Sequence, residues 1–378
     1  MELHEYRREF PITHRHAFLN HASVSAQNHR VIQALTAYFA RGESQPFNRL
    51  LPDLLALREE FAQRVAALIN AARSDEVVPM GGTASGINTA ANSLPLRAGD
   101  NVLVLEGDYP AVIYPWLNLA PKGVLTKVVP QSQGGLDLDV LQARIDYKTR
   151  VIAISTAMFA TGYRNDMAAV GRLCRERDIY FVADGIQTLG AFPLDVQECQ
   201  IDFLACGSQK WLLSEPGAGF LYCRHDLLRE LQLGAYVGSA STVDPLNFLD
   251  FNFTLQDTAE RFSLGTPNVL GMVALNASLA LLHEVGIERI SERVTTLTDV
   301  LIHDLSGLGY PVLSNLAPER RSGIVLIGVA DPEGQYERLM AANVVTSLRG
   351  AGLRVSPHFY NTEEDVLRVG EVLGRRSW

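Results

Sequence analysis

The chain has 378 residues, of which 47% are hydrophobic and 20% charged, so it can bury a large core and is long enough for about two domains. Its formal net charge of −9 and the lack of a basic stripe argue against a nucleic-acid backbone as partner. No apolar run reaches the roughly 18 residues of a membrane span and no signal peptide is recognisable, so we expect a cytoplasmic protein that does not bind membranes.

Short apolar segments typical of strands alternate with helical patterns between about residues 60 and 225. The expected strands are residues 101–105, 124–129, 151–155, 179–183, 203–206 and 219–222. This alternation predicts an α/β fold in which a mostly parallel sheet is covered by helices on both faces.

The rest of the chain is expected to form an irregular segment and a smaller domain. Residues 234–262 show no regular pattern and could line the site or a dimer interface. A helical pattern then runs over residues 268–305, and residues 323–329, 344–348 and 353–355 read as strands of the smaller domain.

A glycine-rich turn follows the apolar pair Val77-Val78 and leads into a helical stretch over residues 87–94. Backbone amides at a helix start bind anions, and Thr83 and Ser85 can add hydroxyl donors, so the turn is a candidate phosphate site. The glycine spacing fits neither a dinucleotide fingerprint nor a Walker loop. Simple helix capping is the alternative.

Two of the predicted strands lead into an acid and a base. Asp184 closes the strand over residues 179–183, and Lys210 follows the apolar residues 201–206 after a small polar turn. Ligands of parallel sheets bind at the carboxyl ends of the strands. Lys210 is one of only four lysines, and a desolvated amine, unlike a guanidinium, can lose its proton and attack a carbonyl.

An aspartate and a lysine in this arrangement suit pyridoxal 5′-phosphate. The lysine holds the aldehyde as a Schiff base, and the aspartate keeps the pyridine nitrogen protonated so that the ring accepts electrons. The alternative is that Asp184 caps a helix and that Lys210 is a surface residue.

At these residues the chain resembles the class V aminotransferase family of fold-type I pyridoxal-phosphate enzymes, which includes cysteine desulfurases and isopenicillin-N-epimerase-like proteins. The resemblance runs over nearly the whole length. Its motifs are Phe18-Leu19-Asn20-His21-Ala22-Ser23, Gly82-Thr83-Ala84, Gly107-Asp108-Tyr109-Pro110, Thr161-Gly162, Asp184-Gly185-Ile186-Gln187, Gly207-Ser208-Gln209-Lys210, Gly265-Thr266-Pro267-Asn268, and Leu353-Arg354-Val355-Ser356 with Tyr360-Asn361-Thr362.

The resemblance implies the fold and the domain limits. We expect a fold-type I transferase whose large domain, residues 14–262, holds a mostly parallel seven-stranded sheet and binds the cofactor. A smaller C-terminal α/β domain follows over residues 263–378, and residues 1–13 are expected to pack on it. The family also implies a homodimer.

The resemblance also implies roles for single residues. Lys210 forms the Schiff base, Asp184 pairs with the pyridinium, and Gln187 lies near the phenolic oxygen of the ring. Tyr109 stacks on the cofactor face. The phosphate is held by Thr83, the Ala84 amide and Gln209, with Thr266 reaching across the dimer interface to the partner's phosphate.

Two further residues are assigned to the substrate. Arg354 stands where the family binds the substrate carboxylate in a bidentate fork, with Arg349 or Arg164 as the alternatives. His21 is expected on the substrate side, with a structural hydrogen-bonding role as its alternative.

Three departures from the desulfurases are visible. Phe159 replaces an asparagine, and Gln209 stands in for a histidine. There is no cysteine between residues 345 and 354, where desulfurases carry their catalytic cysteine, so persulfide chemistry is not expected.

The cysteines and histidines carry no further site signal. Cys174, Cys199, Cys206 and Cys223 form no CxxC pair and are expected to be reduced. His14, His16 and His21 lack a carboxylate or cysteine at ligand spacing, so no metal is expected.

These observations lead to one expected function and several alternatives. We expect an enzyme that binds a small amino acid and passes through an external aldimine and a quinonoid, most simply an aminotransferase. A Cβ lyase and an isopenicillin-N-type epimerase share the same residues up to that point. A degenerate relative that serves as a binding dimer is the alternative without enzymatic activity.

Overall fold

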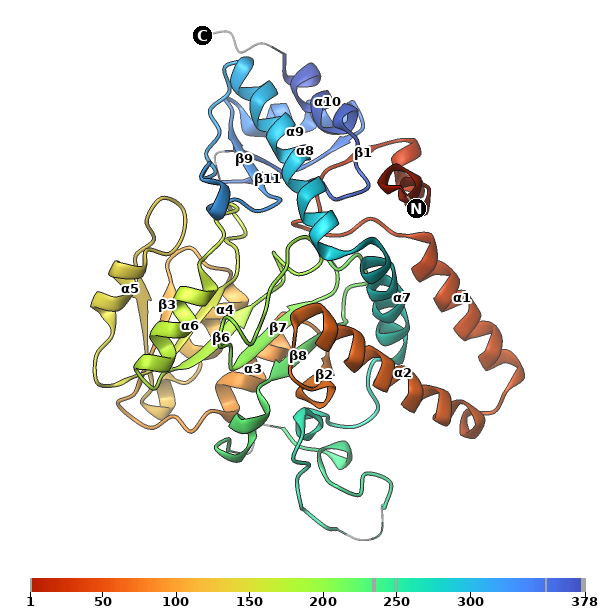
Figure 1. Cartoon of the computed structure of the whole chain (residues 1–378), viewed down its shortest axis with the longest axis vertical. Coiled ribbons are helices and arrows are strands. Elements are labelled where there is room, and N and C mark those ends of the chain that lie inside the picture. Colours follow the sequence, from red (N-terminus) through yellow and green to blue (C-terminus); the bar gives the residue numbers. More distant parts are fainter. Residues whose placement is uncertain (1, 233–235, 248, 250, 351, 375–378) are drawn as a thin grey trace.

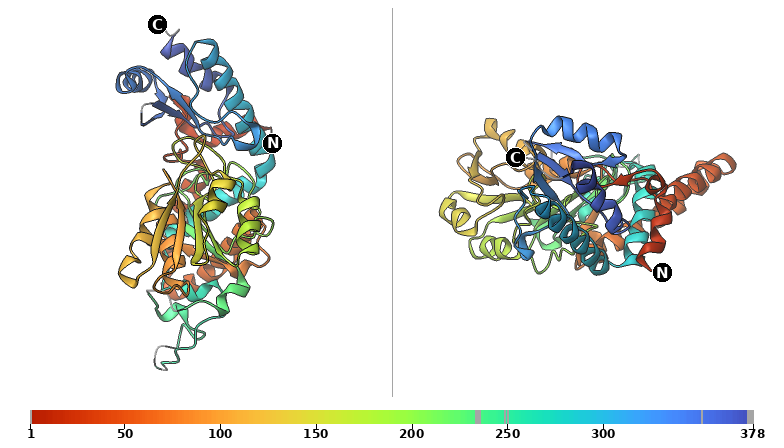
Figure 2. Two further views of the ribbon diagram at one scale, coloured as in Figure 1. Left: turned by 90° about the vertical axis from the view of Figure 1, so that its left-hand side faces the viewer. Right: turned by 90° about the horizontal axis from the view of Figure 1, so that it is seen from above.

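The computed structural model describes residues 2–232, 236–247, 249, 251–350 and 352–374, with residues 47–51 in backbone only. Figures 1 and 2 show two parts, one above the other, joined near the N-terminal segment and the helix α8. The lower part contains the large sheet and the upper part a smaller one.

The lower part is built on a seven-stranded sheet in the order β2-β8-β7-β6-β5-β3-β4. Its strands are β2 (Val77–Met80), β3 (Asn101–Leu105), β4 (Leu125–Val129), β5 (Thr149–Ser155), β6 (Tyr180–Asp184), β7 (Phe203–Gly207) and β8 (Gly219–Cys223). Only β8 runs against its neighbours, pairing antiparallel with both β2 and β7, while the remaining pairs are parallel. The predicted mostly parallel seven-stranded sheet is confirmed.

Alternating side chains of the central strands enter two separate cores. On β3, Leu103 and Leu105 join the apolar cluster on one face, whereas Val102 and Val104 join the cluster on the other. A strand buried on both faces needs apolar residues at every position, which explains the unbroken apolar runs of the sequence. The helices covering the two faces include α3 (Thr83–Ser93), α4 (Pro110–Leu117), α5 (Leu138–Arg144) and α6 (Met167–Glu176).

The upper part contains a three-stranded antiparallel sheet in the order β11-β12-β9. Its strands are β9 (Val325–Gly328), β11 (Ser347–Arg349) and β12 (Gly352–Val355), with α8 (Ile287–Gly307), α9 (Pro332–Ala341) and α10 (Glu363–Leu373) packed around them. The short strand β1 (Ala17–Phe18) pairs with β10 (Val344–Val345), which ties the N-terminal segment to this part. The strand expected over residues 344–348 is therefore two short strands with different partners.

The helical pattern over residues 268–305 also forms two elements. Gly286, with a φ of 89°, separates α7 (Val269–Val285) from α8 and lets the chain turn sharply. Helix α7 packs against α1 (His29–Ser44) and α2 (Phe47–Ile69), beside the large sheet. Within the described residues, no single helix could cross a membrane by length and composition, and α7 and α8 qualify only as a pair bent by 80°.

The first residues of the chain contact both parts. The Tyr6 hydroxyl donates to Glu284 at the end of α7, and Arg7 forms an ion pair with Asp365 of α10 at 2.6 Å. The domain limits expected from the sequence, residues 14–262 and 263–378 with 1–13, remain a prediction.

Candidate active site

Lys210 and Asp184 lie at the same edge of the large sheet. Asp184 is the last residue of β6 and stands opposite Ala205 of the parallel neighbour β7, while Lys210 follows β7 by three residues. Both side chains are buried, although they come from different segments. The pairing of β6 with β7 therefore brings the acid and the base into one site.

The carboxylate of Asp184 is held at only one of its oxygens. Oδ1 accepts hydrogen bonds from the Ile186 amide at 2.9 Å and from the Thr83 hydroxyl at 3.4 Å. Oδ2 is buried and has no hydrogen-bond partner among the described residues. Burial raises the pKa of Asp184, against the Ile186 amide and the Lys210 charge, which lower it. A buried acceptor without a donor is costly, so Oδ2 fits a donor brought by a ligand.

The amine of Lys210 lies in surroundings that favour its neutral form. Burial lowers its pKa to about 8, although the charge of Asp184 opposes this shift. The positive charges of Arg354 and Arg349 contribute to this lowering of the pKa. Nζ is 5.4 Å from the ring centroid of Tyr109. A lysine of this kind can act as a nucleophile or as a base near neutral pH.

Tyr109 forms an aromatic wall beside Lys210. The residue is 44% exposed, and its ring meets the ring of Phe159 edge-on, with 5.3 Å between the centroids. The backbone of Tyr109 is fixed by the buried Asp108, whose Oδ1 accepts from the Tyr109 amide at 2.7 Å and whose Oδ2 accepts from the Ser155 amide at 2.8 Å. The sequence did not reveal this role of Asp108, because only the β3–β5 pairing brings Ser155 to it.

The candidate phosphate site lies at the start of α3. Gly82, with a φ of 140°, precedes the helix, and the first intrahelical bond runs from the Gly86 amide to the Gly82 carbonyl. The amides of Thr83 and Ala84 therefore have no acceptor within the helix. The Thr83 hydroxyl, in contrast, accepts from the Gly207 amide at 3.0 Å and faces Asp184. Thr83 can thus offer an anion its amide, while its hydroxyl braces Asp184.

Thr266 is not beside Lys210. It is exposed and lines a cavity of about 670 Å³ together with Gly81 and Ser85. Neither Lys210 nor Asp184 lines this cavity. We regard the surroundings of Lys210 as the reactive site, because the buried acid and base are there.

Arg354 carries a buried positive charge that has no carboxylate partner among the described residues. It lies on β12, and its guanidinium donates to the Ser347 hydroxyl at 3.2 Å, the Phe159 carbonyl at 2.6 Å and the Ser23 hydroxyl at 2.5 Å. All three acceptors are neutral. Burial, together with the charge of Arg349, lowers the pKa of Arg354 to about 9. A buried guanidinium of this kind is suited to an anionic ligand.

The two alternative carboxylate anchors are placed differently. Arg349 shares the Ser23 hydroxyl with Arg354, donating to it at 3.1 Å. Arg164 instead lies over the ring of Phe192, 5.1 Å from its centroid, and the charge of Arg320 acts on it. The structure therefore brings Arg349, and not Arg164, together with Arg354.

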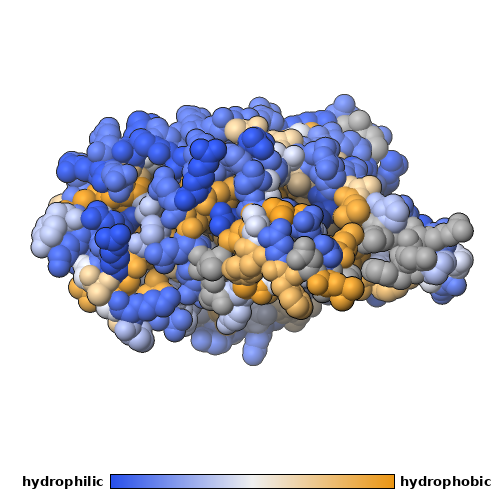
Figure 3. Space-filling view, turned by 90° about the horizontal axis from the view of Figure 1, so that it is seen from below, coloured by the Kyte–Doolittle hydropathy of each residue, from blue (hydrophilic) through white to orange (hydrophobic). Residues whose placement is uncertain are grey.

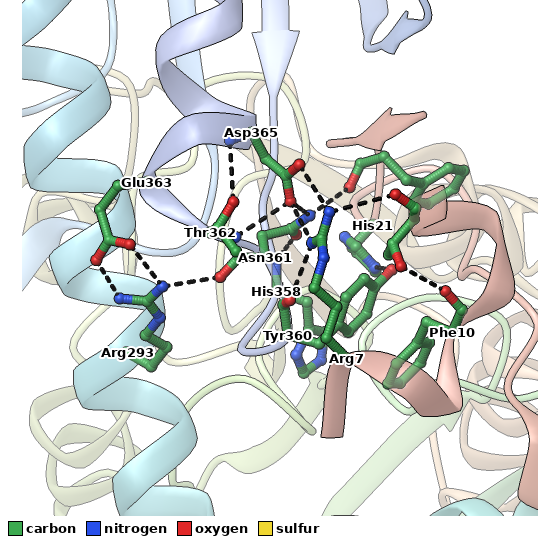
Figure 4. A network of polar contacts seen from close by, with 12 residues as sticks. Arg7, Phe10, His21, Arg293, His358, Tyr360, Asn361, Thr362, Glu363 and Asp365 are labelled. Atoms are coloured by element: carbon green, nitrogen blue, oxygen red, sulfur yellow. Dashed lines mark hydrogen bonds and ion pairs between the residues drawn. The ribbon is translucent and has the colours of Figure 1, made fainter. Parts of the chain in front are cut away.

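His21 belongs to a polar network behind the site (Figure 4). Its Nδ1 is 2.9 Å from the Ser356 carbonyl, and its Nε2 is 2.7 Å from the Tyr360 hydroxyl. Burial and the neighbouring His358 lower the pKa of His21 well below its usual value. Because both ring nitrogens have protein partners, the geometry favours the structural role over substrate binding.

The two glutamines of the motifs are also held by the protein. Gln187 donates to the Ala22 carbonyl at 3.1 Å and accepts from the Trp211 indole at 3.0 Å, which leaves one amide hydrogen for a ligand. The side chain of Gln209 folds back over Gly207, where an added Cβ would lie 2.6 Å from its Oε1. The roles assigned to both residues remain predictions.

The cysteines lie away from the surface, and none of the described residues forms a metal site. Cys174, Cys199, Cys206 and Cys223 are free and buried, and burial raises the pKa of each thiol. No group of three or more His, Cys, Asp and Glu side chains in the described residues could hold a metal ion.

Comparisons with known proteins agree with this geometry. The family model described as Aminotransferase class-V matches residues 17–369. A probable cysteine desulfurase from Methanothermobacter thermautotrophicus is 29% identical, over 99% of this chain and 98% of that protein. An uncharacterized aminotransferase of Bacillus subtilis, YcbU, is 27% identical over 96% of this chain and 95% of that protein.

A solved structure shares the fold over nearly the whole length. The apo cysteine desulfurase of Thermococcus onnurineus superposes with a TM-score of 0.87 at 22% identity, covering 98% of this chain and 96% of that one. At this identity the likeness concerns the fold alone.

Proposed function

Because the chain belongs to the class V aminotransferase family of pyridoxal-phosphate enzymes, we propose that it is an aminotransferase acting on a small amino acid. The observation that carries this proposal is the buried Asp184 Oδ2, which has no hydrogen-bond partner in the described structure, next to a lysine whose pKa is lowered. An acceptor aimed at a ring nitrogen and an amine able to attack an aldehyde are the two groups that pyridoxal phosphate requires.

The residues present fit the cofactor. Asp184 would hold a proton on the ring nitrogen, Tyr109 would stack on the ring, and Gln187 would face its phenolic oxygen. The phosphate would lie at the α3 amides of Thr83 and Ala84, with Gln209 beside it. When bound, pyridoxal phosphate supplies an electrophilic carbonyl and an electron sink for the substrate.

The other steps belong to the side chains of the chain itself. Arg354 orients the substrate through its carboxylate. Lys210 would act as the base that takes a proton from the substrate Cα, and its ammonium form would then deliver a proton to the carbon of the cofactor carbonyl rather than back to Cα. Arg354 and Lys210 are both buried, so water is kept away from them. Their electrostatic interactions with the substrate are stronger for this reason.

The connection between β11 and β12 argues for this proposal and against a desulfurase. Arg349 pairs with Gly352, so only residues 350 and 351 join the two strands. A desulfurase places a nucleophilic cysteine on a loop just before the residue that corresponds to Arg354. Here neither of the two connecting residues is a cysteine, and all four cysteines are buried elsewhere.

We further propose that the active unit is a cytoplasmic homodimer. The segment between β8 and α7 exposes Tyr236, Leu246, Leu249, Phe251 and Phe253, of which Leu249 and Phe251 are each 95% exposed. Figure 3, which views the molecule from below, shows apolar surface gathered on this face between hydrophilic areas. Apolar surface of this kind favours association. Thr266, at the end of the same segment, would then contribute to the partner's phosphate site.

A product assay distinguishes the proposal from its alternatives. The holoenzyme is incubated with a panel of amino acids, each with and without an oxo-acid acceptor. An aminotransferase turns over repeatedly only with the acceptor and forms a new amino acid from it. Ammonia and an oxo acid without acceptor would indicate a Cβ lyase, inverted substrate an epimerase, and no product from any substrate a degenerate binding dimer.

A further inference from the structure

Arg349 is a second positive charge at the site, and it too has no acidic partner in the described part of the chain. It ends β11, and its guanidinium donates to the Leu348 carbonyl at 2.6 Å and to the Ser23 hydroxyl at 3.1 Å. No carboxylate of the described residues lies within ion-pair distance of it. Its side chain is only partly buried, whereas Arg354 is fully buried.

Several arginines elsewhere in the chain are neutralised by acids. Arg7 pairs with Asp365, Arg30 with Glu284 and Arg293 with Glu363. Two neighbouring guanidinium groups that share one neutral hydroxyl are therefore a local excess of positive charge. Like charges this close repel, and the interaction with Arg349 works against the charge on Arg354. The arrangement becomes favourable when anions are brought to it.

One carboxylate compensates only one of these charges. If the α-carboxylate of the substrate binds the deep Arg354, the outer Arg349 still faces the site without an anion. A second acidic group on the substrate would supply that anion and form charge-assisted hydrogen bonds with Arg349. Ser23, which holds both guanidinium groups, sets the spacing between the two anion positions.

We propose that Arg349 is a specificity-determining residue that binds a second anionic group, so that the substrate is an amino acid with an acidic side chain. This inference rests on the proposed function, because it assumes that Arg354 takes the α-carboxylate. The competing arrangement is that both arginines grip the same carboxylate, and an experiment on binding separates the two.

The experiment measures the binding of carboxylates to the holoenzyme by isothermal titration calorimetry at fixed ionic strength. The probes are the dicarboxylates succinate, glutarate and adipate, with butyrate as the monocarboxylate. We expect at least one dicarboxylate to bind about tenfold more tightly than butyrate. The Arg349→Gln variant should lose this preference, while its affinity for butyrate changes by less than about threefold.

Two further variants serve as controls. Arg144→Gln removes an exposed arginine at the end of α5 and should leave every affinity unchanged. Arg349→Lys keeps the charge and should retain part of the preference, and it also serves as the test if Arg349→Gln does not fold. Circular dichroism and the cofactor absorbance verify that each variant is folded and loaded.

Several outcomes would overturn the inference. These are dicarboxylates that bind no more tightly than butyrate, an equal loss of affinity for both ligand classes in Arg349→Gln, or no measurable binding of any probe. Because binding needs no group transfer, the result does not depend on the product assay. An enzyme that proves to be a lyase could still prefer acidic substrates, and an aminotransferase could still fail this test.

Discussion

At the scale of single residues, burial shifts the pKa values of Lys210 and Asp184 in the directions that favour their neutral forms. For Lys210 the folded pKa of about 8 lies below the ordinary value of 10.5, so the free amine becomes abundant as the pH rises through about 8. We expect cofactor-free protein to take up pyridoxal phosphate with a rate that rises through this pH. Stopped-flow absorbance would measure this rate. A pH midpoint near 10.5, the ordinary pKa of lysine, would contradict the lowered pKa of Lys210.

Asp184 gives a second prediction at this scale. Asp184→Asn removes the charge that would keep the ring nitrogen protonated, so we expect kcat to fall by roughly 100-fold or more with the cofactor still bound. Steady-state kinetics and the absorbance of the bound cofactor are measured together. Asp139→Asn, on the exposed surface of α5, is the matched control. Normal turnover by the Asp184→Asn variant would mean that Asp184 is only structural.

At the scale of elements, the position of α3 depends on a glycine. An added Cβ at Gly86 would lie 2.7 Å from the Ala205 Cβ on β7, and the buried strand cannot move away. Gly86→Ala should therefore lower the free energy of unfolding by about 1–3 kcal/mol and displace the candidate phosphate amides. In α1, Gly42 has no atom within 4 Å of an added Cβ, so Gly42→Ala should stabilise by about 0.5–1 kcal/mol. Urea denaturation measures both, and equal effects would contradict the tight α3–β7 contact.

The elements also show what the sequence can predict. The sequence pattern predicts strands such as β3 at their full length, because a strand buried on both faces is an apolar run between polar turns. The break at Gly286 was missed, since the helical pattern continues across it and only tertiary packing separates α7 from α8.

For the candidate site, residue types and order indicated Lys210 and Asp184. The bracing of Asp184 by Thr83, the anchoring of Tyr109 by Asp108 and the sharing of Ser23 by two arginines could not be predicted. Each of these contacts joins side chains whose neighbours are set by the fold and not by spacing in the chain.

At the scale of the whole molecule, the exposed apolar segment and Thr266 lead to a prediction about assembly. Sedimentation analysis should give a dimer, and Thr266→Ala should lower the occupancy of the cofactor in the dimer because a phosphate donor is lost. Thr296→Ala, on the exposed surface of α8, should leave occupancy unchanged. A monomer with full occupancy and activity would contradict this assembly.

The central claim is that the buried edge of the large sheet, at Lys210 and Asp184, holds pyridoxal phosphate. Borohydride reduction of the holoenzyme followed by peptide mapping tests it most directly, because the reduced cofactor stays attached to the lysine that carried it. We expect one modified peptide, the one that contains Lys210, and a stable, folded Lys210→Arg variant that is neither labelled nor active. Modification of Lys122, Lys127 or Lys148 instead, or an active Lys210→Arg variant, would contradict it.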